Sequence, residues 1–182
     1  MKKTLIALSI LALAGCATQA SAPAPKLKDG EVAVPADYKT WPKFLSEIQR
    51  PDAKQVREAF INPTGAAVKA GGAFANGTLM VMEIYKAREN ADGTLMKGSD
   101  GKLVKGDLAK VFVMGKGAGW GELAPAGLKN GDWSYSAFLA DGKTPSPDPM
   151  AACRACHMPL GDAKDYVHRY DEYFQNRPVS SY

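Results

Sequence analysis

The sequence predicts an α+β fold, built mainly from an antiparallel sheet with flanking helices. Three stretches, residues 78–85, 109–114 and 133–139, alternate their side chains between two faces with the two-residue period of a β-strand. Residues 150–158 and 163–174, near the carboxyl end, have the pattern of helices. The chain has 182 residues and no internal repeat, so we expect one domain with a core.

The segment before the first of these strands predicts shorter elements. Residues 38–48 are typical of a helix interrupted at Pro42. Residues 56–61 form a short apolar run that ends at the turn signal Asn62-Pro63, and residues 63–70 fit a short helix. We therefore expect helices at the amino end of the domain.

The first strand, residues 78–85, is the clearest one. Met80 and Met82 point to the same face, and both faces of the strand are apolar enough to be buried. Asp92-Gly93 and Asp100-Gly101 follow it and are turn dipeptides. They predict a hairpin-like excursion before the next strand.

The amino terminus has the features of an export signal. Lys2 and Lys3 precede an apolar stretch, residues 5–14, which is too short to span a bilayer as a helix. It ends in Leu13-Ala14-Gly15-Cys16, which resembles the bacterial lipoprotein processing box, where the cysteine is acylated before cleavage. The alternative is a plain signal peptide followed by an incidental cysteine.

These features predict a domain organisation and a location. We expect a lipoprotein signal peptide over residues 1–15, a flexible tether over residues 16–35 and one folded domain over residues 36–182. The residue after the lipidated Cys16 is Ala17 and not Asp, which favours the outer membrane over retention at the inner one. The domain would then be anchored by lipid and face the periplasm.

Charge and cysteine content exclude some classes of protein. The chain has 23 Lys and Arg against 19 Asp and Glu, and removal of Lys2 and Lys3 with the signal peptide leaves 21 against 19, a net charge of +2. So small a charge argues against nucleic acid as a partner. There are only three cysteines, one of them Cys16, so no disulfide framework is expected.

The chemistry is expected from Cys153-Arg154-Ala155-Cys156-His157, the C-x-x-C-H signature for covalent attachment of haem. One helical turn brings both sulfurs to the two vinyl groups of one porphyrin, and the imidazole of His157 then binds the iron. The alternatives are a thioredoxin-like redox pair, half of a zinc site, and coincidence. The pair lacks a βαβ setting and zinc lacks further ligands, so we predict one covalent haem c on Cys153, Cys156 and His157.

His168 is the only other histidine. On a continuous helix it lies roughly three turns, or about 16 Å, from His157. Because that is too far to reach the same iron, we expect an ordinary surface or half-buried histidine.

Several features, in one order along the chain, carry a resemblance to a known family. They are residues 35–41, Arg57 six residues before Pro63, residues 74–78 opening the strand to Glu83, residues 131–133, the C-x-x-C-H motif, and residues 165–167. The domain thereby resembles the cytochrome P-460 family, which includes the cytochromes called c-prime-beta. The resemblance implies a mainly antiparallel β fold that forms homodimers, and a five-coordinate haem whose open face binds small nitrogen ligands.

One position departs from that family. Its hydroxylamine-oxidising members have a lysine tied covalently to the porphyrin edge, and the matching position here is Met82. Lys86 shares the face of Met82, but four residues along a strand is about 13 Å, too far to substitute. We therefore expect no such cross-link.

The resemblance also implies three residues at the open face of the haem. Arg57 matches an arginine that hydrogen-bonds a ligand of the iron; its alternative is a surface ion pair. Phe60 matches an aromatic position that limits access to the iron; its alternative is core packing. Met82 is core filler, pocket wall or iron ligand, and we favour the first two, because the matching lysine meets the porphyrin edge and not the metal.

Three functions follow as hypotheses. The first is a haem protein that binds nitric oxide or a related nitrogen ligand at a five-coordinate iron. The second is an electron carrier with Met82 as the sixth ligand and a redox partner protein that the sequence does not identify. The third is an oxidoreductase that oxidises hydroxylamine or nitric oxide without the lysine cross-link.

Overall fold

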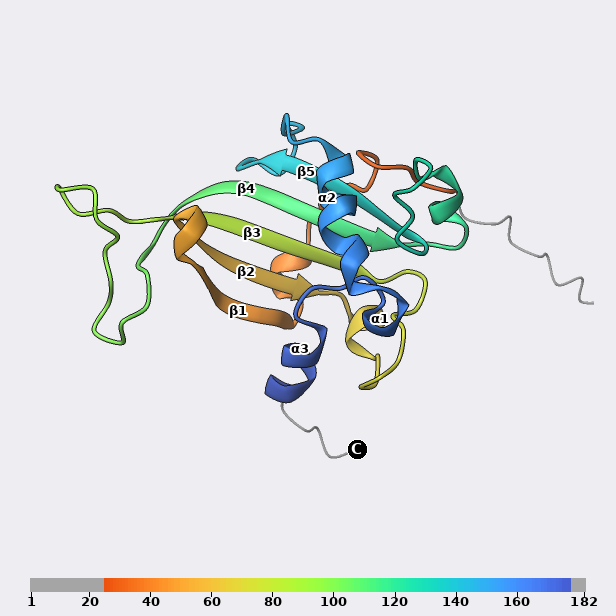
Figure 1. Cartoon of the computed structure of the whole chain (residues 1–182), viewed down its shortest axis with the longest axis horizontal. Coiled ribbons are helices and arrows are strands. Elements are labelled where there is room, and N and C mark those ends of the chain that lie inside the picture. The colour runs from red at the N-terminus through yellow and green to blue at the C-terminus, as the bar shows by residue number, and fades with distance from the viewer. Residues whose placement is uncertain (1–24, 178–182) are drawn as a thin grey trace, which may run out of the picture.

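A computed structural model describes residues 25–177, so the predicted signal peptide and Cys16 lie outside the described part of the chain. Its centre is a five-stranded antiparallel sheet in which each strand pairs with the next one in sequence (Figure 1). The strands are β1 (Lys43–Arg50), β2 (Gln55–Ile61), β3 (Leu79–Ala87), β4 (Lys105–Lys116) and β5 (Trp133–Leu139).

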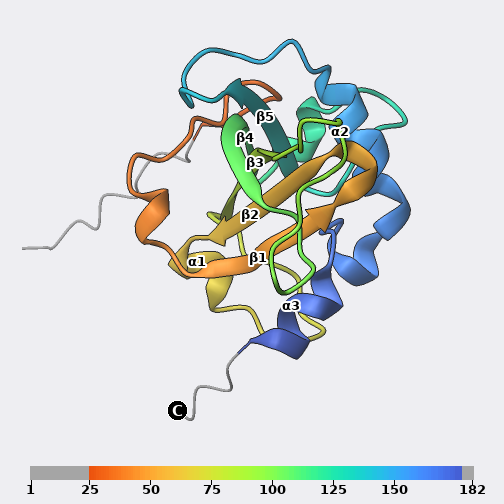
Figure 2. The same ribbon diagram turned by 90° about the vertical axis from the view of Figure 1, so that its left-hand side faces the viewer.

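Short helices connect the strands and cover the sheet. The α-helices are α1 (Pro63–Ala66), α2 (Met150–His157) and α3 (Tyr170–Asn176), and the 3-10 helices are η1 (Tyr38–Thr40), η2 (Pro51–Ala53), η3 (Trp120–Leu123), η4 (Met158–Leu160) and η5 (Asp162–Lys164). Helices α2 and α3 lie on the same side of the sheet (Figures 1 and 2). The predicted α+β fold is confirmed. Within residues 25–177, none of these helices has the length and apolar character needed to cross a membrane.

The strand register divides the side chains between two faces. Met82 pairs with Ala59 on one side and with Phe112 on the other, so these three share a face. Ala59 packs in the core cluster that also contacts Cys153 of α2, and we call this the front face. Phe60 pairs with Val81 on the opposite face, the back face.

The back face is covered by the segment that precedes the sheet. Val32 is only 2 % exposed and packs in the same core cluster as Phe60. The carboxylate of Asp29 accepts a hydrogen bond from the main-chain amide of Tyr135 at 3.0 Å. Residues 27–34 are therefore part of the folded domain, and the prediction of a flexible tether was wrong for them. Their sequence shows no helical or strand period, so it did not indicate a fixed structure. They are held by contacts with residues about a hundred positions later in the chain.

The helix predicted over residues 38–48 was also wrong, except for the short η1. From Lys43 the chain forms the strand β1. Pro42 ends the helical turn, and its carbonyl accepts a hydrogen bond from the amide of Ile61 at 3.0 Å, where pairing with β2 begins. The strand β1 that follows is irregular, because Glu47 has a left-handed φ of 50° and the register shifts there. Pairing with β2 decides the conformation, and the local sequence does not show it.

The helix predicted over residues 163–174 was wrong for its first part. An α-helix, α3, begins only at Tyr170. Asp165, Tyr166 and Arg169 have left-handed φ values of 46°, 56° and 57°. A right-handed helix cannot pass through such residues. The chain therefore reverses direction beside α2, which determines the geometry of the candidate site.

The hairpin-like excursion is confirmed. Residues 88–104 leave the sheet between β3 and β4 and carry two isolated bridges, Glu89 with Leu95 and Lys97 with Leu103. Gly93 and Gly101 have left-handed φ values of 80° and 78°, as their turns require. In Figures 1 and 2 this excursion projects from the end of the sheet away from α2.

Candidate haem site

The C-x-x-C-H motif forms the carboxyl-terminal half of α2. Cys153 and Cys156 stand one turn apart with free thiols, the first half-buried and the second exposed. Burial raises the pKa of the Cys153 thiol. A catalytic redox pair needs a thiol with a lowered pKa, and burial at Cys153 acts in the opposite direction.

His157, the last residue of α2, is held by one main-chain carbonyl. Its Nδ1 lies 2.6 Å from the carbonyl oxygen of Tyr166. A carbonyl can only accept, so Nδ1 carries the hydrogen and Nε2 has the free lone pair. Burial lowers the pKa of His157 to about 4, so the ring is neutral at pH 7. A neutral imidazole with Nε2 free is the form that binds a metal.

Arg154 anchors α2 to the rest of the domain. Its side chain is 1 % exposed and forms a two-pronged ion pair with Asp29, at 2.6 and 2.8 Å. It also donates to the carbonyls of Leu128 and Trp133. Asn130 donates in turn to the Arg154 carbonyl at 3.0 Å. Sequence patterns did not indicate this anchor, because Asp29 lies 125 residues before Arg154, in the predicted tether.

His168 lies beside the motif and not 16 Å away. Its ring centroid is 4.7 Å from that of His157, and its Nε2 is 3.4 Å from Sγ of Cys156. The predicted distance assumed a continuous helix, and the left-handed turn at Asp165 and Tyr166 brings the chain back. His168 is exposed, as expected of a surface residue, yet it borders the candidate site.

Part of the front face beside α2 is covered by no helix (Figure 1). We call it the open front face, and its partly exposed residues come from β2, β3 and β4: Arg57, Met82, Lys110 and Phe112. Met82 and Phe112 are partly exposed and are absent from the core clusters. An apolar surface with cationic side chains thus lies next to the motif.

The structure brings two of the three expected distal residues together and separates the third. Arg57 and Met82 both lie on the open front face. Phe60 lies on the back face, where its ring packs edge-on against Tyr38 at 5.2 Å and Lys43 lies over it at 3.6 Å. The expectation that Phe60 limits access to the iron was therefore wrong, and core packing is its role. Residues three apart on one strand face opposite sides, so the strand period contained this answer.

Arg57 is half-buried and has a neutral partner. Its Nε and one terminal nitrogen both donate to the side-chain carbonyl of Gln55, at 3.0 and 2.7 Å. Among the described residues it forms no ion pair, so the alternative of a surface ion pair was wrong. Burial, followed by the nearby Arg50, lowers its pKa. A half-buried cation without a carboxylate favours an anionic or polar ligand.

Lys110 is a second cation of the open front face, and sequence reasoning did not single it out. Ile84 of β3 pairs with Arg57 of β2 on one side and with Lys110 of β4 on the other. Its ammonium is 2.6 Å from the carboxylate of Asp148, just before α2. Unlike the charge of Arg57, the charge of Lys110 is therefore already paired.

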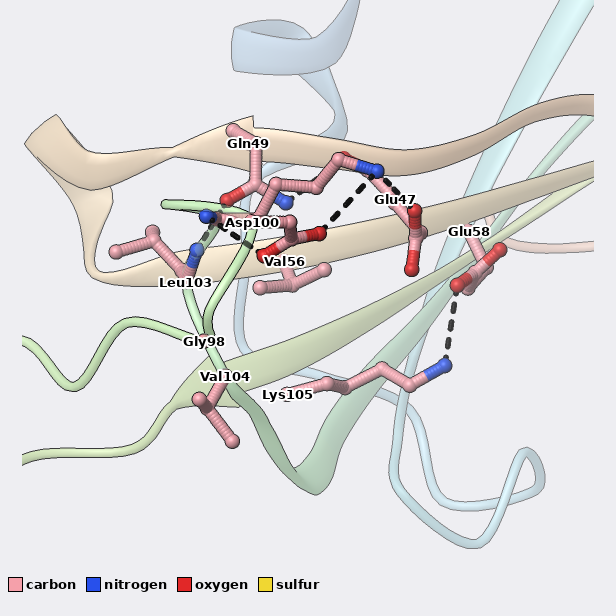
Figure 3. A pocket seen from close by; sticks show the side chains of 10 residues that line it. Glu47, Gln49, Val56, Glu58, Gly98, Asp100, Leu103, Val104 and Lys105 are labelled. Atoms are coloured by element: carbon pink, nitrogen blue, oxygen red, sulfur yellow. Dashed lines mark hydrogen bonds and ion pairs between the residues drawn. The ribbon is translucent and has the colours of Figure 1, made fainter.

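Hollows among the described residues also occur away from α2. One, of about 230 Å³, lies between β1, β2 and the excursion (Figure 3). Its charged side chains pair with one another, Lys102 with Glu47 at 2.6 Å and Lys105 with Glu58 at 3.0 Å. None of its lining residues belongs to α2, so it is not part of the candidate site.

The residues present fit a haem group. Two free thiols one turn apart and a neutral imidazole with a free Nε2 are the donor set that c-type attachment needs. The partly exposed Met82 and Phe112 offer an apolar surface to a porphyrin. Within residues 25–177, no three His, Cys, Asp or Glu side chains are grouped to hold a metal ion on their own.

The C-x-x-C-H motif of α2 is the signature of c-type haem attachment. The chain belongs to the cytochrome P460 family, because the model of that family, described as cytochrome P460, matches residues 35–169. The match spans the whole sheet and α2 and ends just before α3. Membership makes the chain a haem protein of the cytochrome class. A comparison with curated proteins found none that matches.

Proposed function

We propose that the protein carries one covalent haem c, tethered through Cys153 and Cys156, with His157 as the iron ligand. The observation that carries this proposal is the hydrogen bond from His157 Nδ1 to the Tyr166 carbonyl, which leaves Nε2 free beside two free thiols. When bound, the haem would supply an iron that can take up small ligands and electrons. Arg154 and Asp29 would keep the motif in place.

Covalent attachment has a direct test. The protein is produced with the cytochrome c maturation machinery and then extracted with acidified acetone. We expect the pigment to stay with the wild-type chain and to be extracted from the Cys153→Ala/Cys156→Ala double variant. Wild-type protein that is colourless, or that loses its pigment to the solvent, would contradict the proposal.

The proposed activity is binding of a small nitrogen ligand, such as nitric oxide, at a five-coordinate iron. Arg57 supports it, because its charge has only the neutral Gln55 as partner and could donate to a polar ligand. Met82 and Phe112 would form an apolar wall of the ligand pocket. Lys110 is paired with Asp148 and would contribute less.

The second candidate is an electron carrier with Met82 as the sixth ligand. It is favoured by the position of Met82, whose partly exposed thioether lies on the open front face next to the motif. A thioether ligand raises the reduction potential and excludes external ligands.

Electronic spectra of the reduced protein separate these two candidates. We expect a high-spin spectrum that shifts when nitric oxide is added, in wild type and in Met82→Leu alike. Met114→Leu, on the same face but in the core cluster, is the matched control. Sharp low-spin bands that disappear only in Met82→Leu would establish the electron carrier instead. Turnover of hydroxylamine in the presence of an electron acceptor would support the third hypothesis, an oxidoreductase that oxidises hydroxylamine or nitric oxide.

We also propose that the protein is exported, acylated at Cys16 and held at the outer membrane facing the periplasm. The support is the sequence of residues 1–17. Labelled palmitate should enter the wild-type protein and not Cys16→Ala. The family resemblance further favours a homodimer, for which a doubled mass in size-exclusion chromatography with light scattering is the test.

A further inference from the structure

The left-handed turn that supplies the carbonyl for His157 is held by a buried network. We infer that Asp165, Lys116 and Trp133 form a proximal brace, which positions the Tyr166 carbonyl and so tunes the iron through His157. The inference rests on the proposed haem ligation by His157. It assigns a positioning role to residues outside the motif itself.

The turn needs outside support. Asp165 and Tyr166 are consecutive residues with left-handed φ values of 46° and 56°. Residues with a Cβ avoid this conformation and keep it only where the surroundings hold them. Without that support, the relaxed chain would move the Tyr166 carbonyl away from His157.

The carboxylate of Asp165 provides the support. It is buried and accepts a hydrogen bond from the main-chain amide of Phe74 at 2.8 Å. The ammonium of Lys116 binds both of its oxygens, at 2.7 and 2.8 Å. The indole N–H of Trp133 donates to the Asp165 main-chain oxygen at 2.9 Å. Three separate segments therefore converge on one residue of the turn.

The ion pair is unusual for its burial. The side chain of Lys116 is 12 % exposed and that of Asp165 is 8 % exposed. Lys116 also lies over the indole ring of Trp133, with 5.5 Å between its ammonium and the ring centroid. Buried pairs with extra hydrogen bonds fix geometry even where their net contribution to stability is small. This one fixes the residue next to the one that contacts His157.

The consequence falls on the imidazole. A short Nδ1–H to carbonyl bond, here 2.6 Å, fixes the ring and makes Nε2 a stronger donor to a metal. A stronger donor stabilises the oxidised iron and strengthens the iron–histidine bond. Loosening the brace should therefore raise the reduction potential and lower the iron–histidine stretching frequency.

The test compares two variants that remove opposite charges, Asp165→Asn and Lys116→Met, in the holoprotein. We expect both to raise the potential, by on the order of a tenfold change in the reduction equilibrium, which is 59 mV for one electron. Both should also lower the stretching frequency in resonance Raman spectra. Trp133→Phe removes the indole N–H that donates to the main-chain oxygen and to one carboxylate oxygen of Asp165. It leaves the ion pair intact, so it should shift both quantities in the same direction by less, and it covers the case in which a charge variant fails to fold.

Other outcomes overturn the inference. If the pair acted on the iron only through its charges, Lys116→Met would lower the potential and Asp165→Asn would raise it. If the pair were only structural, unfolding would occur at lower urea concentration while potential and frequency stayed at the wild-type values. Glu83→Gln, which alters a buried carboxylate on the back face, is the control for lost stability and should leave both values unchanged. A colourless wild type would refute the haem proposal itself, whereas pigmented variants with unchanged values refute only the brace.

Discussion

Glu58 and Glu83 on the back face of the sheet and Arg57 on the front face have different kinds of partner. On the back face, Glu58 and Glu83 are buried neighbours across β2 and β3. Glu58 accepts hydrogen bonds from two lysines, and Glu83 accepts them from two tyrosine hydroxyls. On the front face, Arg57 is half-buried with only the neutral Gln55 as its partner.

This difference separates structure from ligand binding. A charge whose partners are all inside the fold stabilises the fold and has nothing left to offer a ligand. A half-buried cation with an uncharged partner keeps its attraction for whatever enters beside it. The carboxylates of Glu58 and Glu83 therefore serve to close the domain, whereas the charge of Arg57 stays available beside α2.

The largest expected effect concerns the anchor of α2. Arg154→Ala removes the cation that pairs with Asp29 and the donor to two main-chain carbonyls. Breaking a buried pair from one side costs about 3–5 kcal/mol, and urea unfolding of the holoprotein should show that loss. Arg50→Ala, which breaks an exposed pair with Asp52, should change stability little. Equal effects of the two variants would mean that α2 is held by packing alone.

Removal of the half-buried cation tests the difference between the faces directly. Arg57→Leu should weaken binding of nitric oxide by roughly tenfold to a hundredfold, since a hydrogen bond from a charged group contributes about 1.5–3 kcal/mol. Glu83→Gln, on the back face, should leave the affinity unchanged. The affinity of each variant is measured as the ratio of its rate constants for nitric oxide binding and release. If both variants weaken binding alike, the faces do not differ in function.

Acidification tests the back face. Burial alone would raise the pKa of Glu58, but hydrogen bonds from Lys105 and Lys43 outweigh it and lower the pKa below its ordinary 4.5. Its contribution to stability is therefore fully present above about pH 4.5 and is lost as the pH falls through the lower folded-state pKa. Urea unfolding between pH 3 and 7 should give a shallower decline for Glu58→Gln than for wild type. Parallel curves would show that this carboxylate is not stabilised by its lysines.

The smallest effect is expected from Phe60. Phe60→Leu, on the back face, should cost about 1 kcal/mol of stability and leave the rate of nitric oxide binding unchanged. Phe112→Leu, on the open front face, should alter that rate. Stopped-flow measurements on the two variants compare one aromatic residue from each face. A changed rate in Phe60→Leu alone would reverse the assignment of the faces.

Local patterns predicted the regular parts of this fold. The two-residue period found β3, β4 and β5, because their side chains alternate between two buried faces. The helix around the C-x-x-C-H motif was also predicted, and the motif lies within α2. The match to the family model then confirmed the family.

The parts that could not be predicted depend on contacts distant in sequence. Asp29 has no pattern of its own and is fixed by Arg154, 125 residues later. The left-handed turn at Asp165 and Tyr166 contains no glycine that would have predicted it, and Lys116 stabilises it through its ion pair with Asp165. Phe60 is the exception, because the strand period alone would have separated it from Arg57.

The packed segment before the sheet restricts how far the domain can stand from a membrane. If Cys16 is acylated, a free chain to residue 35 would allow about 70 Å of reach, whereas a chain fixed from about residue 25 allows about 30 Å even when fully extended. Asp29, near the start of that fixed segment, pairs with the arginine inside the C-x-x-C-H motif. If Cys16 is acylated, a haem on that helix would therefore stay close to the membrane.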